Sequence, residues 1–320
     1  MKCISAFWLI ILLLTGCLAP TSDREQKNRS LHEAAEHGSI EVIHYLLAHG
    51  AEINDKGTKE QTALFSATEY NHTELAFYLM DHEADITLNN RDNRTLLMQS
   101  AFNNNLTLVK YFLELGIDIN AQSKDKTTAL HLATAKHHID MIRWLIEHGA
   151  EVNVSNKDGW TPLLLASQES LEAIIYLLIQ KGADVDVKNV QQQTALHLLI
   201  GEGSLALVRY FLKLDIDIDA KDSQGITPLM EAAIFGEVCM VKLIHQKGAD
   251  IHAQDHNGNT PLVHASVHGE FEVVRYLLAH NARVNHKNRR GETVFDLVKA
   301  SIHMKWAQKK AMLAYLMSFT

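Results

Sequence analysis

The chain contains few of the residues that cross-link or rigidify a fold: three cysteines and four prolines among 320 residues. Three cysteines cannot build the disulfide framework of a small secreted domain, and Cys3 and Cys17 both lie within the first seventeen residues. Positive charge is also scarce, with 30 Lys and Arg against 38 Asp and Glu and a formal net charge of −8. Because a nucleic-acid binder needs a cationic surface, this balance argues against nucleic acid as a partner. The 47% of hydrophobic residues is enough for a sizeable core and excludes a disordered or collagen-like chain.

The N-terminal segment has the form of an export signal. Lys2 precedes an apolar run from Ala6 to Leu14, whose nine residues are too few to cross a hydrocarbon layer of about 30 Å as a helix. The following Leu14-Thr15-Gly16-Cys17 resembles the lipobox of bacterial lipoprotein signal peptides, in which the cysteine is acylated and becomes the new N-terminus. The resemblance implies a signal peptide over residues 1–16, a lipid anchor on Cys17 and a polar tether over 17–28. The alternative is an ordinary signal peptide that ends in a chance cysteine.

A repeat of 33 residues runs through the rest of the chain without insertion or deletion. It is marked by threonines at equal spacing, and counting back once more gives Arg29: Thr62, Thr95, Thr128, Thr161, Thr194, Thr227, Thr260 and Thr293. We number each unit from this residue as position 1. Position 3 is Leu in the first eight units and Phe295 in the ninth, and positions 22 and 23 read Gly-Ala in four units. Such units cannot bury an apolar face alone, so they must stack into a solenoid.

These residues resemble the ankyrin repeat. Its pattern is clearest in Thr128-Ala-Leu-His-Leu-Ala133, which leads to Gly149-Ala-Glu-Val-Asn153, and in Asp158-Gly-Trp-Thr-Pro-Leu163, which leads to Gly182-Ala-Asp184. The resemblance implies an all-α repeat solenoid of helix-loop-helix units with projecting β-hairpin fingers over residues 29–320. Units are expected to start near residues 29, 62, 95, 128, 161, 194, 227 and 260, with a truncated capping unit from 293. In that last unit, we expect Trp306, Met312, Leu313, Tyr315 and Leu316 to form an apolar stripe.

Histidine is abundant, with 19 residues, but most histidines occupy fixed repeat positions. Position 4, where the family's histidine bonds between neighbouring loops, holds His32, His131 and His197; position 21, near the C-terminal carbonyls of the second helix, holds His49, His82, His148 and His280. His32 and His37 are five residues apart, not the four of a zinc-protease helix. The acidic run 215–222 lacks the glycine and the bidentate glutamate of a calcium loop. We therefore expect no metal, no cofactor and no catalytic site, and the chain is predicted not to be an enzyme.

The positions that vary between units predict a binding surface. In ankyrin-like proteins, positions 8, 9 and 0 and the fingers form a concave groove. Here these positions carry large apolar side chains that are candidate anchors for a partner protein: Tyr70, Phe102, Trp160, Ile234 and Phe235. The alternative is that these side chains pack on the finger of a neighbouring unit.

We expect a monomeric, lipid-anchored scaffold at the bacterial cell envelope, on the outer membrane or the periplasmic face. It would bind a partner protein through the groove, and the sequence names neither the partner nor the organism. The alternative is a secreted effector of a host-associated bacterium that acts on a host protein. Towards the C-terminus a local basic excess is formed by Arg283, Lys287, Arg289 and Arg290 and later by Lys299, Lys305, Lys309 and Lys310. We interpret this excess as a solvated capping surface, or else as a contact for anionic lipid or an acidic partner.

Overall fold

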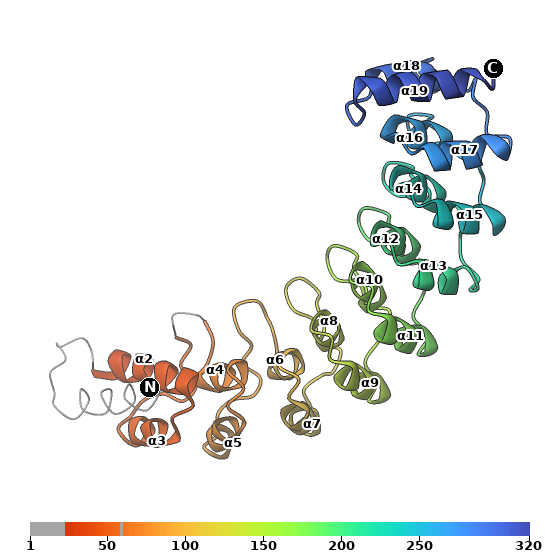
Figure 1. Ribbon diagram of the computed structural model, residues 1–320. Helices are drawn as coiled ribbons and strands as arrows, with labels where there is room; N and C mark the ends of the chain where they lie inside the picture. Colours follow the sequence, from red (N-terminus) through yellow and green to blue (C-terminus); the bar gives the residue numbers. More distant parts are fainter. Residues whose placement is uncertain (1–22, 58–59) are drawn as a thin grey trace. The chain divides into compact units, whose positions relative to one another are not determined.

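The computed structural model describes residues 23–57 and 60–320. Within these ranges the chain forms helices and no strand, so the predicted all-α repeat architecture is confirmed (Figure 1). The chain divides into two compact parts, which we call the N-terminal unit, ending at Lys157, and the C-terminal unit, beginning at Asp158. Each stretch of 33 residues within them is called a repeat. The predicted signal peptide and Cys17 lie outside the described residues.

Each unit is built from pairs of short antiparallel helices. The N-terminal unit contains α2 (Asp23–His37), α3 (Ile40–Ala48), α4 (Ala63–Glu69), α5 (Thr73–Asp81), α6 (Leu96–Phe102), α7 (Leu106–Glu114), α8 (Ala129–Ala135) and α9 (Ile139–Glu147). The C-terminal unit contains α10 (Pro162–Gln168), α11 (Glu172–Gln180), α12 (Ala195–Gly201), α13 (Leu205–Phe211), α14 (Pro228–Ile234), α15 (Val238–Gln246), α16 (Pro261–His268), α17 (Phe271–Ala279), α18 (Val294–Ala300) and α19 (Trp306–Met317). Within each unit the even-numbered helices pack side by side in one row and the odd-numbered helices form the second (Figure 1).

The repeat threonines determine where the first helix of each pair begins. The Thr hydroxyl accepts a hydrogen bond from the backbone N–H three residues later and so satisfies a free donor of the first turn. Five threonines cap in this way: Thr62, Thr95, Thr128, Thr161 and Thr227. Pro162, Pro228 and Pro261 follow at the first helical position, where the missing N–H has no partner to lose.

The core of each unit lies between the two helical rows. The leucine at position 3 is at most 2% exposed in all eight full repeats, from Leu31 to Leu262. It packs with the inward side chains of the second helices, such as Ile142 and Leu145 on α9. The predicted register, in which position 3 faces the core, is therefore confirmed.

A left-handed residue at position 22 ends most second helices. Gly149 and Gly248 have φ of 98° and 104°, a region that is easiest for glycine. An added Cβ there would meet no atom within 4 Å, so backbone conformation and not space explains the glycine. In the sixth repeat Asp215 replaces the glycine, and α13 spans seven residues where α11 and α15 span nine.

The fingers are turns, and the expectation of β-hairpins is corrected here. Residues 23–57 and 60–320 contain only one isolated bridge, between Lys287 and Thr293. A finger is closed by two backbone bonds that share one residue, such as Asp222 N–H to Ile226 O and Gly225 N–H to Asp222 O, both at 3.0 Å. It is joined to the next finger by another bond, such as His256 N–H to Gln224 O at 2.9 Å. These bonds close turns and do not make a ladder, because a strand needs several successive pairs.

The two ends of the described chain also differ from expectation. Helix α2 begins at Asp23, so residues 23–28 are helical and belong to the first repeat, not to the tether predicted over 17–28. Asn28 is buried there, and its side-chain oxygen accepts a bond from Glu52 N–H at 2.8 Å. At the other end, Met312 and Leu316 are buried as predicted, but Trp306 is 75% exposed and does not join the core.

Candidate protein-binding surface

The candidate anchors lie where the first helices end. Tyr70 follows α4 and Phe235 follows α14, and their side chains are 46% and 53% exposed. Tyr70 stacks on His72, with ring centroids 6.5 Å apart. The positions that vary between repeats therefore present aromatic surface to solvent in both units.

The other three candidates are more enclosed. Phe102, at the end of α6, is half-buried, and the Lys136 ammonium from the next repeat lies 4.6 Å from its ring centroid. Trp160 is also half-buried. Ile234 packs against the buried cluster of Ile226, Met230 and Ala253 within the C-terminal unit. For Ile234 the contacts therefore match the alternative that the sequence left open, in which the side chain packs on a neighbouring finger.

Glu231, which sequence reasoning missed, is the most perturbed group of this surface. It lies at position 5 on α14, and burial, with a smaller contribution from the Asp222 carboxylate, raises its pKa to about 7. One repeat later, the equivalent positions hold an ion pair, with His264 Nε2 3.1 Å from Asp255 Oδ2. In the Glu231 repeat both members of the pair are acidic, so the Glu231 carboxyl faces a like charge where Asp255 in the next repeat is bonded by a histidine. The signal in the sequence is this pairing of Asp at position 29 with Glu at the next position 5.

The histidines at repeat positions have structural partners. At position 21, Nδ1 of each histidine bonds the carbonyl oxygen four residues earlier, over 2.7–2.8 Å, in His49, His82, His148 and His280. At position 4, His197 Nε2 bonds Ile226 O in the next finger at 3.1 Å, which confirms the predicted bond between loops. Through Nδ1, His197 and His131 also close the N-caps of their own helices, with Thr194 and Thr128.

The acidic run 215–222 holds the fingers together. The Asp219 carboxylate accepts a bond from the backbone N–H of Asp250 in the next finger, and Asp222 Oδ1 accepts from the N–H groups of Gln224 and Ile226. Burial raises the pKa of Asp219, although the bond from Asp250 N–H opposes the shift. The run thus consists of finger residues, as interpreted from its repeat position.

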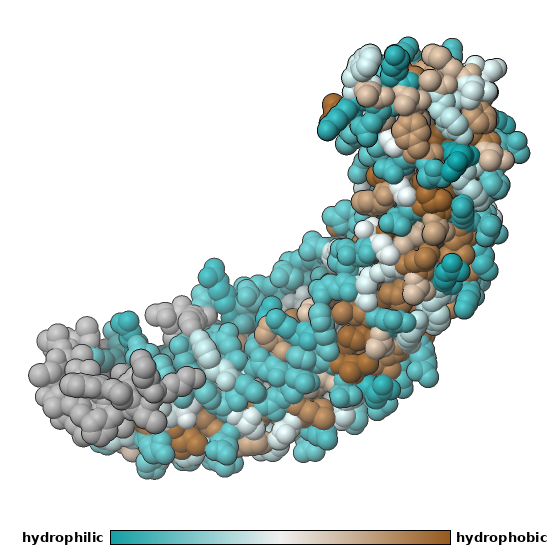
Figure 2. Space-filling view, in the orientation of Figure 1, coloured by the Kyte–Doolittle hydropathy of each residue, from teal (hydrophilic) through white to brown (hydrophobic). Residues whose placement is uncertain are grey.

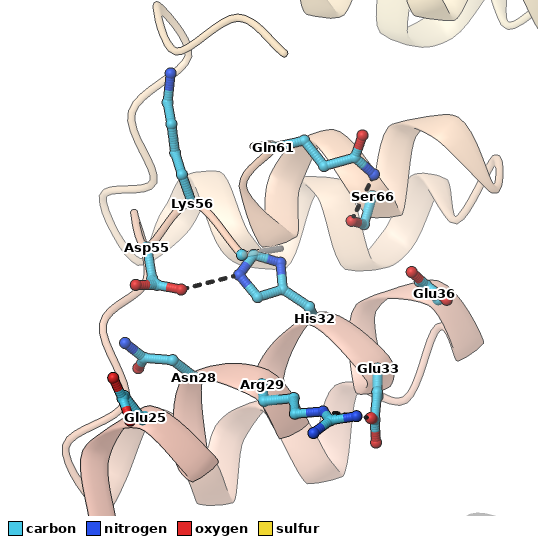
Figure 3. A pocket seen from close by; sticks show the side chains of 11 residues that line it. Glu25, Asn28, Arg29, His32, Glu33, Glu36, Asp55, Lys56, Gln61 and Ser66 are labelled. Carbon is cyan, nitrogen blue, oxygen red and sulfur yellow. Dashed lines mark hydrogen bonds and ion pairs between the residues drawn. The ribbon is translucent and has the colours of Figure 1, made fainter. Parts of the chain in front are cut away.

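A charged hollow of about 630 Å³ lies between α2, its finger and α4 (Figure 3). His32 Nε2 is 3.2 Å from Asp55 Oδ2 across it, and Arg29 pairs with Glu33 on the same helix at 3.6 Å. Gly57 borders the His32 ring so closely that a Cβ would come within 2.7 Å of it. The charged side chains here mostly pair with one another, so we read the hollow as part of the N-terminal cap.

The described residues hold no cluster of three or more His, Cys, Asp or Glu side chains suited to a metal ion. The described part of the chain also has no helix with the length and apolar character needed to cross a bilayer. Cys239, on α15, is an exposed free thiol.

Comparison with known proteins identifies the repeat. The family model for ankyrin repeats (three copies) matches residues 31–123, 97–189, 178–255 and 196–288, which together cover most of the chain. A comparison with curated proteins gave no match.

Proposed function

This chain belongs to the ankyrin repeat family, and from that premise we propose that it is a non-catalytic scaffold that binds a partner protein through its first-helix ends and fingers. Members of the family are generally protein-binding scaffolds. The observation that carries the proposal for this chain is the exposure of Tyr70 and Phe235 at variable repeat positions. Aromatic side chains at such positions are frequent hot spots, because they bury a large area and lose little side-chain entropy.

The neighbourhood of Phe235 supports the same reading. Glu231 lies one turn earlier on α14, and burial raises the pKa of its carboxyl to about 7. A large fraction of the carboxyl is therefore protonated at pH 7. A cationic side chain from a partner would stabilise the ionised carboxylate, as His264 does for Asp255. We propose that the partner places an aromatic or aliphatic group on Phe235.

We further propose that the scaffold is lipid-anchored through Cys17 at the bacterial cell envelope, on the outer membrane or the periplasmic face, and acts as a monomer. The support is the Leu14-Thr15-Gly16-Cys17 sequence after a short apolar run. The second candidate, a secreted effector that binds a host protein, would use the same binding surface and differs in its destination.

The test compares partner capture by matched variants. Tyr70→Ser with Phe235→Ser removes the two exposed anchors. Leu115→Ser with Tyr176→Ser removes two exposed side chains of the second-helix row, 45% and 37% exposed, which lie outside the candidate surface. Proteins that the wild-type chain captures from envelope fractions are identified, and the affinity of each purified partner is measured. We expect the anchor variant to bind at least about tenfold more weakly, since hot-spot residues contribute about 2 kcal/mol or more.

The control variant should bind like wild type, and both variants should unfold at the wild-type midpoint. If the anchor variant keeps full affinity while it remains folded, the partner binds elsewhere and this surface is not the site. If the unfolding midpoint of the anchor variant falls first, Tyr70 and Phe235 are packing residues instead.

A further inference from the structure

The last helix pair exposes apolar side chains to an unusual extent. Ile302 is 91% exposed, Trp306 is 75% exposed, and Met317 and Phe319 are both about half exposed. In the described part of the chain, no other large apolar side chain is as exposed as Ile302 or Trp306. In Figure 2 the surface over α18 and α19 mixes apolar side chains with hydrophilic ones. Large exposed apolar groups of this kind usually mark an interaction surface.

Two of these side chains, Trp306 and Met317, lie on one stripe of α19. Trp306, Lys310, Leu313 and Met317 follow the i, i+4, i+7, i+11 spacing of a single helix face. With Lys299 and Lys309 they line a hollow of about 440 Å³. Because Met312 and Leu316 supply the buried side of α19, the stripe is free of the helix packing.

Lysines accompany this stripe without any acidic residue nearby in sequence. The Lys310 ammonium lies 5.4 Å from the Trp306 ring centroid, and Lys309 Nζ donates to Lys299 O at 3.0 Å. Residues 297–320 contain four lysines and no Asp or Glu, although the whole chain has a net charge of −8. The preceding acid, Asp296, is bound to Thr293 at the N-cap of α18. We call Lys299, Trp306, Lys309, Lys310, Leu313 and Met317 the C-terminal cap surface.

We propose that the C-terminal cap surface binds the surface of a bilayer that contains anionic phospholipid. Tryptophan favours the interfacial layer of a bilayer, where its ring is half solvated, and the Leu313 and Met317 side chains of the same stripe gain by burial beside it. Lysines near an anionic leaflet strengthen binding by about fivefold each. A second copy of the chain fits less well, because it would bring two lysine-bearing surfaces together.

The test measures binding of the full chain to vesicles by sedimentation. One set contains phosphatidylglycerol and phosphatidylcholine, and the other contains phosphatidylcholine alone. The proposal expects the phosphatidylglycerol vesicles to be bound at least tenfold more tightly at low salt, with the difference lost at high salt. Every protein retains residues 1–22, so any binding by the apolar run 6–14 is the same throughout and appears with phosphatidylcholine alone.

Matched variants locate the interaction. Lys309→Gln with Lys310→Gln should weaken binding to phosphatidylglycerol vesicles by about thirtyfold. Lys124→Gln with Lys126→Gln changes the charge equally on exposed finger residues of the N-terminal unit and should have little effect. Position 32, occupied by Lys126, is Gln192 two repeats later with the same left-handed backbone, so the control fits the fold.

Trp306 provides a local readout. Brominated phosphatidylglycerol should quench the fluorescence of the wild-type chain more strongly than that of Trp306→Phe, which keeps an aromatic ring and should bind but retain only the quenching of Trp8, Trp144 and Trp160. Equal binding to both vesicle types, an unaffected Lys309/Lys310 variant, or quenching that is as strong in Trp306→Phe as in the wild type would each overturn the proposal. Binding to an acidic polypeptide but not to vesicles, or a dimer that Trp306→Ser dissociates in the absence of lipid binding, would also overturn it. None of these outcomes depends on the proposed groove or on Cys17.

Discussion

Glu231 should make the C-terminal unit less stable as the pH rises from about 4.5 to 7. Its carboxyl is largely buried on α14, and burial, aided by the Asp222 carboxylate, raises its pKa from 4.5 to about 7. In the unfolded chain the pKa returns to its ordinary value. Between the two values the folded state keeps a proton that the unfolded state has released, so ionisation favours unfolding. The destabilisation by Glu231 is absent below the pKa of the unfolded chain, about 4.5, and is complete above about pH 7.

The size of this effect follows from the shift. One pKa unit corresponds to about 1.4 kcal/mol, so the shift corresponds to about 3 kcal/mol as an upper figure. Glu231→Gln keeps the shape and removes the charge. We therefore expect the variant to gain stability over the wild type progressively from pH 5 to pH 8, by about 1–3 kcal/mol in total. Any cost of burying the amide is independent of pH and does not alter this slope.

The assay is urea unfolding of both proteins at pH 5, 6, 7 and 8, followed by circular dichroism. Comparing Glu231→Gln with wild type at each pH cancels the titration of the histidines, which both proteins share. Glu33→Gln, at position 5 of the first repeat, is the control, because Glu33 is 47% exposed and forms a surface pair with Arg29. If the free energies of unfolding of wild type and Glu231→Gln differ by the same amount at every pH, the argument from burial is refuted.

Three further outcomes are expected. Leu163→Ala should lower the free energy of unfolding by about 2–5 kcal/mol in a urea series, because position 3 is buried. His148→Ala, at an exposed residue, should lower it much less, and similar losses for the two variants would contradict the register. Thr161→Ala should cost about 1 kcal/mol by removing the cap of α10, with Thr161→Ser as the variant that restores most of it. Intact mass of the native mature protein should show an acylated Cys17 at the N-terminus, and Cys17→Ala should leave the membrane fraction; a native N-terminus without lipid mass would remove the anchoring proposal.

The repeat itself could be read from the chain alone. Threonine caps, position-3 leucines and the glycines that end the second helices act within one repeat or between adjacent repeats, so a period of 33 residues was enough to place helices and core. The histidines at position 21 followed for the same reason, since their partner is a carbonyl oxygen four residues away. The sequence also marked Tyr70 and Phe235 as variable, and their exposure agrees with that, although their role in binding stays a prediction.

Tertiary structure decided what the period leaves open. A repeat position specifies which way a side chain points but not what the neighbouring repeat places against it. Glu231 and His264 share position 5, yet one faces an acidic neighbour and the other forms an ion pair, because the residue opposite differs in chemistry. The same holds at the ends, where Asp23–Asn28 joins the first helix and Trp306 stays in solvent. In these two layers burial depends on local packing geometry that no sequence period encodes.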